Sequence, residues 1–292
     1  MPPHPDQRRT VDSLTGLSVG DAFGDQFFLH TNRDLTPATD LPAAPWEWSD
    51  DTEMACSIVD VLLRFGTIEQ DSLAAAFATR LDIARRYGAG ALELLERIQA
   101  GDGWRIASVG SFSGNGSYGN GAAMRVAPLG AYFSADPPRA AAEAAASAEV
   151  THAHPEGVAG AIAVAVAASH AAAHRSGTDL IDTVLAHVPS GYVRRGLERA
   201  RAMPDHSVEQ AAYELGNGSR ITAQDTVPFT LWVAARHLDD YEAAVRAAVA
   251  AGGDMDTTAA IVGGIVAAGV GVEGIPAAWR AAREPLPSWL AL

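Results

Sequence analysis

The sequence predicts an all-α fold, and two observations lead to this prediction. Apolar residues recur at the spacing of one helical face, for example at i, i+4, i+7, i+8 and i+11 in Met54, Ile58, Val61, Leu62 and Phe65. No stretch alternates apolar and polar residues with period two between turn residues, and the β-branched residues lie inside long apolar helical windows. Because no Pro/Gly/Ser-rich linker divides the 292 residues, we expect a single domain over residues 1–292.

The first expected helix runs from about Gln7 to Phe23. Three glycines follow one another at intervals of four residues, Gly16 and Gly20 within this helix and Gly24 directly after it. Glycines at this spacing lie on one side of a helix and allow another helix to approach closely. Residues 29–48 have prolines and few apolar positions, so we expect a surface loop there.

The next helix begins near Ser49 and continues to about Phe65. Further helical patterns occur at about 71–87, 90–99, 137–149, 156–174, 179–187, 191–202, 224–237 and 240–250, and another passes through Met124, Val126 and Leu129. The last expected helix, at 257–270, is apolar on every side, which only a protein interior accommodates. We therefore expect it to be a central buried helix.

Composition excludes several classes of function. The net charge of −14 argues against a general nucleic-acid or membrane-surface binder. All 21 basic residues are Arg, which excludes Schiff-base lysine chemistry and a P-loop lysine. The single Cys56 excludes an intramolecular disulfide and a Cys-based zinc site, and residues 1–9 lack the pattern of a secretory signal. The apolar runs at 157–173 and 259–272 fit core helices better than membrane spans, so we expect a cytoplasmic monomer.

Two clusters of oxygen-bearing side chains lie at the starts of predicted core helices. One contains Ser49, Asp50 and Asp51, and the other contains Asp254, Asp256 and Thr257. Two carboxylates about 4 Å apart repel each other by roughly 4 kcal/mol at an effective dielectric near 20, so a bound cation would relieve them. Hard oxygen ligands suit magnesium, manganese or calcium rather than zinc. Each cluster alone is equally well explained as a helix cap, but the two together favour a pair of metal ions.

A glycine-rich loop at 110–121 and the segment Thr151–Gly157 are further candidates. The loop includes Ser117, Tyr118, Gly119 and Asn120, and its unobstructed backbone N–H groups could contact a sugar or phosphate; a mobile surface loop is the alternative. His152 and His154 precede a helix. No matching pair completes a zinc site, so they either hydrogen-bond a carbonyl, lie exposed, or help to hold a phosphate.

Five short motifs resemble those of the ADP-ribosylglycohydrolase family, which includes dinitrogenase reductase-activating glycohydrolase. They occur in order between about residues 13 and 270, and only their combination makes the resemblance specific. They are Gly20-Asp21-Ala22-Phe23-Gly24, Trp48-Ser49-Asp50-Asp51-Thr52, Gly119-Asn120-Gly121-Ala122-Ala123-Met124-Arg125, Thr151-His152-Ala153-His154-Pro155 and Gly253-Asp254-Met255-Asp256-Thr257-Thr258. The resemblance implies a compact orthogonal helical bundle and metal-dependent hydrolysis of the glycosidic bond between ADP-ribose and an acceptor.

The resemblance also implies roles for individual residues. Two Mg²⁺ or Mn²⁺ ions would be held by Ser49, Asp50, Asp51, Asp254, Asp256 and Thr257, and the ribose and diphosphate by Ser117, Tyr118, Gly119, Asn120 and His152. Where the family often has a glutamate that takes part in catalysis, this chain has Phe28. We therefore take Asp51 as the first candidate for the base and Asp25 as the second.

Three alternatives remain open at this point. The substitution at Phe28 could mark an ADP-ribose binder without catalysis. The same pocket could act on a free derivative such as ADP-ribose 1-phosphate. A magnesium-dependent isoprenoid synthase would also be all-α, but it requires a DDxxD motif and an Asn/Ser/Glu triad that this sequence lacks.

Overall fold

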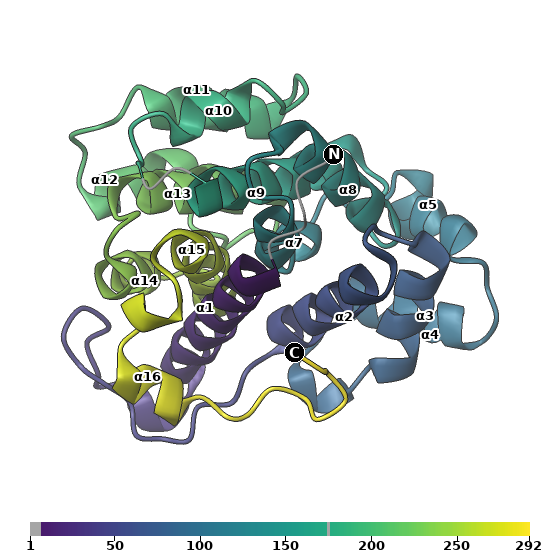
Figure 1. Cartoon of the computed structure of the whole chain (residues 1–292), viewed down its shortest axis with the longest axis horizontal. Coiled ribbons are helices and arrows are strands. Elements are labelled where there is room, and N and C mark those ends of the chain that lie inside the picture. Colours follow the sequence, from purple (N-terminus) through teal and green to yellow (C-terminus); the bar gives the residue numbers. More distant parts are fainter. Residues whose placement is uncertain (1–6, 174–175) are drawn as a thin grey trace.

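The computed structural model describes residues 7–173 and 176–292, and these residues form 16 α-helices and no β-strand (Figure 1), which confirms the all-α prediction. The α-helices are α1 (Gln7–Asp25), α2 (Asp50–Phe65), α3 (Gln70–Arg80), α4 (Ala89–Gln99), α5 (Trp104–Gly114), α6 (Gly121–Met124), α7 (Ala127–Tyr132), α8 (Pro137–Glu149), α9 (Pro155–Ala173), α10 (Leu180–Leu185), α11 (Tyr192–Arg201), α12 (Val208–Leu215), α13 (Ala223–Arg236), α14 (Tyr241–Ala250), α15 (Met255–Val270) and α16 (Ala277–Ala282). Short 3-10 helices are η1 (Gln26–Phe28), η2 (His30–Asn32), η3 (Ile83–Arg85) and η4 (Val272–Gly274). Residues 1–6, part of the segment considered above as a possible signal, lie outside the described residues.

The pair α1 and α15 is antiparallel and packed backbone against backbone. A Cβ atom on Gly16, Gly20 or Gly24 would lie less than 3.0 Å from the backbone of α15, so only glycine fits at these three positions. The glycine spacing thus has the function that the sequence predicted. As a consequence, the C-terminal end of α1 meets the N-terminal end of α15, where Asp254 and Asp256 lie.

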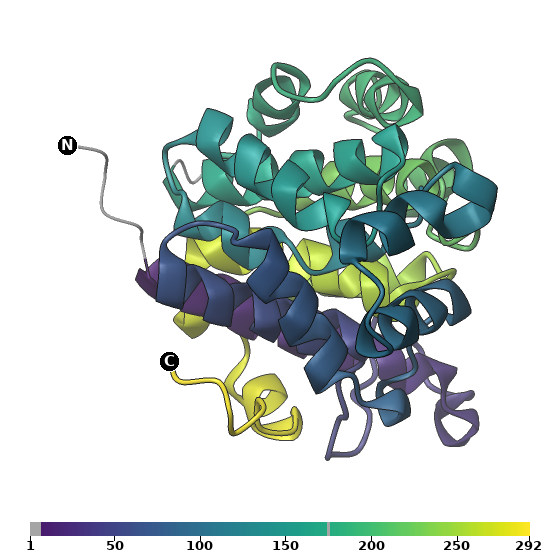
Figure 2. The ribbon, with the colours of Figure 1, turned by 90° about the vertical axis from the view of Figure 1, so that its right-hand side faces the viewer.

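Helix α15 is the central buried helix. It contacts α1, α9, α13 and α14, and Figure 2 shows it running between α1 and the layer that contains α9. Its residues from Thr257 to Gly269 are all buried. This agrees with a sequence that is apolar on every side.

Helix α9 has the length and composition of a membrane span, but 78% of its most apolar 18-residue window is buried inside the protein. It contacts α7, α8, α10 and α15. We therefore describe it as a core helix.

Some element boundaries differ from the predictions. Helix α3 ends at Arg80 rather than near residue 87, because Leu81 leaves the helical conformation (ψ 111°) and η3 follows. The helix expected through Met124, Val126 and Leu129 is split into α6 and α7, with Pro128 in the first turn of α7. Helices α5, α12 and α16 were not predicted from the sequence. A capping box marks the start of α12: the Ser207 hydroxyl accepts the Gln210 backbone N–H, and the Gln210 side chain accepts the Ser207 backbone N–H. This Ser-x-x-Gln pattern could have revealed the helix.

The predicted loop at 29–48 is irregular apart from η2 and is fixed at its end by two buried tryptophans, Trp46 and Trp48. The Trp46 indole N–H donates to the Pro42 carbonyl at 3.1 Å. The Arg85 guanidinium lies 3.3 Å from the centroid of the Trp48 ring and donates to the Trp48 carbonyl. These contacts hold the chain directly before Ser49, where α2 begins.

Candidate active site

A pocket of about 460 Å³ opens where the N-terminal ends of α2 and α15 meet the loop before α6. Its walls include every site residue predicted from the sequence except Asp25 and Ser49, which are buried behind the wall. The predicted residues in the wall are Asp50, Asp51, Ser117, Tyr118, Gly119, Asn120, His152, Asp254, Asp256 and Thr257. The structure therefore brings the two acidic clusters, the glycine-rich loop and the histidine to one cavity.

The start of α2 is organised by Asp21, a buried carboxylate of α1. Ser49 caps α2 by accepting the Asp51 backbone N–H at 3.2 Å, and the Ser49 hydroxyl donates to Asp21 at 2.7 Å. Asp21 also accepts the Thr52 hydroxyl at 2.6 Å and the backbone N–H groups of Ser49 and Thr52. Asp21 thus fixes the turn that presents Asp50 and Asp51 to the pocket. It was not among the predicted site residues, although it belongs to the first motif.

The start of α15 is connected to both other walls. The Asn120 side-chain amide donates to Asp254 Oδ2 at 2.7 Å, which attaches the glycine-rich loop to the second acidic cluster. The Thr257 hydroxyl donates to Asp51 Oδ1 at 3.4 Å, which joins the two acidic clusters. Asp254 does not cap its own helix with its side chain. The helix-cap explanation therefore accounts for Ser49 but not for Asp254.

Burial raises the pKa of every carboxyl group in the acidic clusters and of Asp21 behind them, and repulsion by neighbouring carboxylates adds to this for all but Asp256. Burial, and then the charge of Asp256, raise the pKa of Asp21 and of Asp254 to about 7. Burial raises the pKa of Asp50 and of Asp51 well above 3.8, with further contributions from the neighbouring carboxylates. The pKa of Asp256 is also raised by burial. Arg86 lowers the pKa of Asp256, but among the described residues no ion pair involves Asp21, Asp50, Asp51, Asp254 or Asp256. A divalent ion would stabilise such a group of buried carboxylates.

The oxygen donors of the acidic wall fit Mg²⁺ or Mn²⁺ in kind. Asp51 Oδ2 is buried and has no hydrogen-bond partner among the described residues, so it has a free position for a cation. The same residues contain no group of three or more His, Cys, Asp or Glu side chains that could hold a metal ion in their present positions. The predicted ligands are four carboxylates and two hydroxyls, Ser49 and Thr257, and all six are hard oxygen donors of the kind that these ions prefer. The chemistry of the donor set therefore fits the ions, and metal binding stays a prediction.

The glycine-rich loop is held against the histidine segment and against the chain before α13. The Ala223 N–H donates to the Tyr118 carbonyl at 3.0 Å, and Gly119 pairs with Thr222 as an isolated antiparallel bridge. A Cβ on Gly119 or Gly121 would lie 3.2–3.3 Å from Nε2 of His152, so these glycines allow the ring to lie against the loop. Residues 118–121 of the loop therefore pack against neighbouring segments and form a wall of the pocket.

The mouth of the pocket carries apolar side chains, two of which the sequence analysis missed, Phe112 and Ile221. The Phe112 side chain is 58% exposed, and its ring centroid lies 6.5 Å from that of Tyr118. Helical backbone angles stop at Ser111, and Phe112 has a left-handed φ of 52°, as does Ile221 with 55°. Left-handed bulky residues are rare and are found mainly at functional sites. This signal belongs to the backbone and is not readable in the sequence.

Asp25 and Phe28 lie outside the pocket. Asp25 is buried, and its carboxylate forms an ion pair with Arg86, with 2.7 Å between Oδ1 and Nη2. Burial raises the pKa of Asp25 to about 6 although Arg86 lowers it. Phe28 is half exposed in η1. Arg86, which lines the pocket, therefore stands between Asp25 and the cavity.

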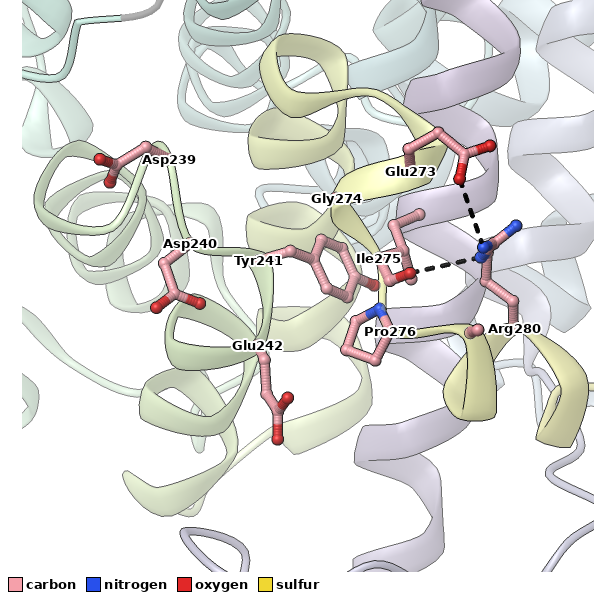
Figure 3. A pocket seen from close by; sticks show the side chains of 10 residues that line it. Asp239, Asp240, Tyr241, Glu242, Glu273, Gly274, Ile275, Pro276 and Arg280 are labelled. Carbon is pink, nitrogen blue, oxygen red and sulfur yellow. Dashed lines mark hydrogen bonds and ion pairs between the residues drawn. The ribbon is translucent and has the colours of Figure 1, made fainter.

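A separate hollow lies beside α14, η4 and α16 (Figure 3). Its carboxylates point in different directions in the figure: Glu273 pairs with Arg280 at 3.8 Å, and Asp240 caps α14 by accepting the Ala243 N–H at 3.0 Å. We assign no ligand to this hollow.

Comparisons with known proteins agree with the geometry. The family model described as ADP-ribosylglycohydrolase matches residues 2–291. An uncharacterized protein of Archaeoglobus fulgidus is 31% identical, over 86% of this chain and 84% of its own length. The ADP-ribosylhydrolase ARH3 of Homo sapiens is 28% identical, over 93% of this chain and 88% of its own length.

A solved structure has the same fold. It is described as an ADP-ribosylglycohydrolase-related protein complex, with a TM-score of 0.68, 25% sequence identity and coverage of 95% of this chain and 93% of that chain. The family match over almost the whole chain and the shared fold lead to one conclusion: the chain belongs to the ADP-ribosylglycohydrolase family, whose members are hydrolases that act on ADP-ribose linkages.

Proposed function

We propose that the protein hydrolyses the glycosidic bond between ADP-ribose and an acceptor, with two Mg²⁺ or Mn²⁺ ions bound at the acidic wall. The acceptor is a protein side chain or a small molecule. The observation that carries this proposal is the meeting of five oxygen-bearing groups, from the N-terminal ends of α2 and α15, with the glycine-rich loop at one cavity. Asp50, Asp51, Asp254, Asp256, Thr257 and, from behind the wall, Ser49 would hold the ions.

The pocket offers a suitable surface for each part of the nucleotide. At the mouth, Phe112 and Tyr118 present ring faces on which a flat base can stack. The Gly119 and Asn120 backbone N–H groups are engaged within the protein, by the Ser117 hydroxyl and the Ile221 carbonyl. The His152 ring, which lines the pocket beside this turn, would donate to the diphosphate. The distal ribose would then point toward Asp51 and Asp256. This orientation places the bond to be cleaved beside the carboxylates.

The reaction requires stabilisation of an oxocarbenium-like transition state and a positioned water. When bound, the ions would orient the ribose hydroxyls and stabilise negative charge on the departing group. The Asp51 carboxylate, whose Oδ2 has no hydrogen-bond partner among the described residues, has lone pairs left both for a cation and for a hydrogen bond from the attacking water. Asp25 is less suited to this role because its carboxylate is engaged by Arg86. Asp51 is therefore the base that we propose.

The decisive experiment compares Asp256→Asn with Asp239→Asn. Both remove one carboxylate charge, but Asp256 lies in the acidic wall whereas Asp239 is exposed on the other hollow. We expect Asp256→Asn to lower metal-dependent release of ADP-ribose from arginine- or serine-linked conjugates by roughly 100-fold or more. Asp239→Asn should be unchanged. The measurement is ADP-ribose release with Mg²⁺, with Mn²⁺ and with a chelator, and circular dichroism checks the fold.

Full activity of Asp256→Asn, or full activity of the wild type after chelation, would overturn the proposal. Binding of ADP-ribose without release from any conjugate would assign the protein to the binding role suggested by Phe28. ADP-ribose 1-phosphate belongs in the same panel, because turnover of this compound alone would identify a free small molecule as the substrate.

A further inference from the structure

Arg125, in the turn between α6 and α7, is a buried cation whose contacts are all uncharged. Its side chain is 1% exposed, and Nη2 donates to Thr151 Oγ1 at 2.8 Å and to the Ser147 carbonyl at 3.3 Å. Nη1 contacts the sulfur of Met54, and the guanidinium lies 4.5 Å from the Phe77 ring centroid. Burial lowers the pKa of this guanidinium to about 9, while electrostatic interactions with Tyr87 and with the Asp50 carboxylate oppose that shift. Because none of the hydrogen bonds that Arg125 forms is to a carboxylate, its position is set by neutral partners, above all Thr151.

The contact with Thr151 fixes the direction of a second hydrogen bond. Thr151 Oγ1 accepts from Arg125 and lies 2.7 Å from Nδ1 of His152. Among the described residues, Nδ1 of His152 is the one acceptor available to the Thr151 hydroxyl hydrogen. If Nδ1 carried a hydrogen, the buried hydroxyl hydrogen of Thr151 would have no acceptor among the described residues, which is unfavourable. The geometry therefore favours the tautomer in which Nδ1 accepts and Nε2 carries the hydrogen.

The histidine is neutral in this setting. Burial, and then the charge of Arg125, lower the pKa of His152 to about 3. A neutral imidazole has one N–H group, and the tautomer decides which of its two nitrogens is a donor.

The other nitrogen lies at the glycine-rich wall of the pocket, which His152 itself lines. Nε2 of His152 lies against the Gly119–Gly121 turn in the pocket wall and has no hydrogen-bond partner in the part of the chain that the structure describes. A hydrogen on this atom would point to the place where we propose that the diphosphate binds.

We infer that Thr151 and Arg125 are positioning residues that hold His152 with its hydrogen on Nε2, so that His152 donates a hydrogen bond to an anionic oxygen of the bound nucleotide. The use of this hydrogen bond rests on the proposed function, whereas the tautomer is a property of the free protein. The two statements can therefore be tested separately.

The first test is ¹⁵N NMR of the histidine rings in the ligand-free protein. His152→Gln identifies the two nitrogen resonances of His152 by their disappearance. We expect the Nδ1 resonance at the position of a ring nitrogen without hydrogen, and the Nε2 resonance at the position of an N–H nitrogen, at neutral pH. A hydrogen on Nδ1 would overturn the inference whatever the protein binds.

The second test compares Thr151→Val with Thr151→Ser by calorimetric titration of ADP-ribose. Valine has the shape of threonine but no hydroxyl, whereas serine keeps the hydroxyl. We expect Thr151→Val to change the His152 ring resonances and to weaken ADP-ribose binding roughly tenfold. Thr151→Ser should retain both wild-type properties. Arg125→Lys, which keeps a charged donor, should retain the tautomer.

Each outcome separates the two proposals. Wild-type affinity in Thr151→Val would show that the hydroxyl does not position His152 for binding, and would overturn the inference. Failure of the wild type to bind ADP-ribose would instead overturn the proposed function, while the NMR result would still decide the tautomer.

Discussion

At the scale of single residues, the mouth of the pocket depends on exposed side chains with unusual backbone angles. Phe112 contributes little to the core because more than half of its side chain is exposed, and its φ of 52° directs the ring toward the ring of Tyr118. Its ring also lies beside Gly90: a Cβ atom added to Gly90 would be 3.1 Å from the Cζ atom of Phe112. Such a side chain is better explained by ligand contact than by packing.

We predict that Phe112→Ala weakens ADP-ribose binding by roughly tenfold to a hundredfold, the usual loss for one base-stacking ring. Binding of ribose 5-phosphate, which has no base, should be unchanged. Ile106→Ala is the matched control, because Ile106 is an exposed apolar residue of the same helix that does not line the pocket. Calorimetry with both ligands checks the prediction, and equal losses for the two ligands would contradict stacking of the base on this ring.

At the scale of elements, the close packing of α1 on α15 sets the position of the acidic wall. The backbones can approach because Gly16, Gly20 and Gly24 lack side chains. The Ser13 hydroxyl adds a hydrogen bond across this contact, to the carbonyl of Gly264, and the Tyr241 hydroxyl of α14 donates to the carbonyl of Gly16 in α1. A small displacement of α1 would therefore move Asp21, and with it the start of α2.

We predict that Gly20→Ala lowers the free energy of unfolding by about 1–3 kcal/mol, because the new methyl group would overlap the Ala259 carbonyl. The control is Gly103→Ala, at a position where nothing lies within 4 Å of the added Cβ and φ is −63°. It should change the free energy of unfolding by less than about 0.5 kcal/mol. Urea unfolding followed by circular dichroism measures both variants, and equal stabilities would show that α1 and α15 can separate without cost.

At the scale of the whole molecule, the acidic wall makes stability depend on pH. In the metal-free protein the pKa values of Asp21 and Asp254 are about 7, above the ordinary 3.8. The folded state therefore holds these protons more tightly than the unfolded state. This stabilisation is complete below about pH 4 and is lost as the pH rises through about 7.

We predict that the free energy of unfolding of the chelator-treated protein falls by a few kcal/mol, to order of magnitude, between about pH 5 and about pH 8. Mg²⁺ or Mn²⁺ should restore more stability at the higher pH, because ionised carboxylates bind the cation. Asp254→Asn should reduce the pH dependence, and Asp239→Asn should not. Urea titrations over this pH range provide the measurement, and stability that rises with pH in the metal-free protein would contradict it.

Much of the architecture was readable in the sequence because it depends on local patterns. Helical spacing predicted α1, α2, α9 and α15, and the glycine spacing in α1 predicted a close helix contact. The shorter helices α12 and α16 were missed, because six to eight residues give too short a window for a helical pattern. The split between α6 and α7 was also missed, although Pro128 was visible.

The sequence by itself determined the candidate site residues, namely two acidic helix starts, a glycine-rich loop and His152, because residue type and helix position are local properties. Only the tertiary structure decided which side chains meet. Arg86 engages Asp25 from 61 residues away, and the turn after α6 brings Arg125 to Thr151 and His152. Such pairs form because packed helices bring distant segments within hydrogen-bond distance, and no local pattern specifies that distance.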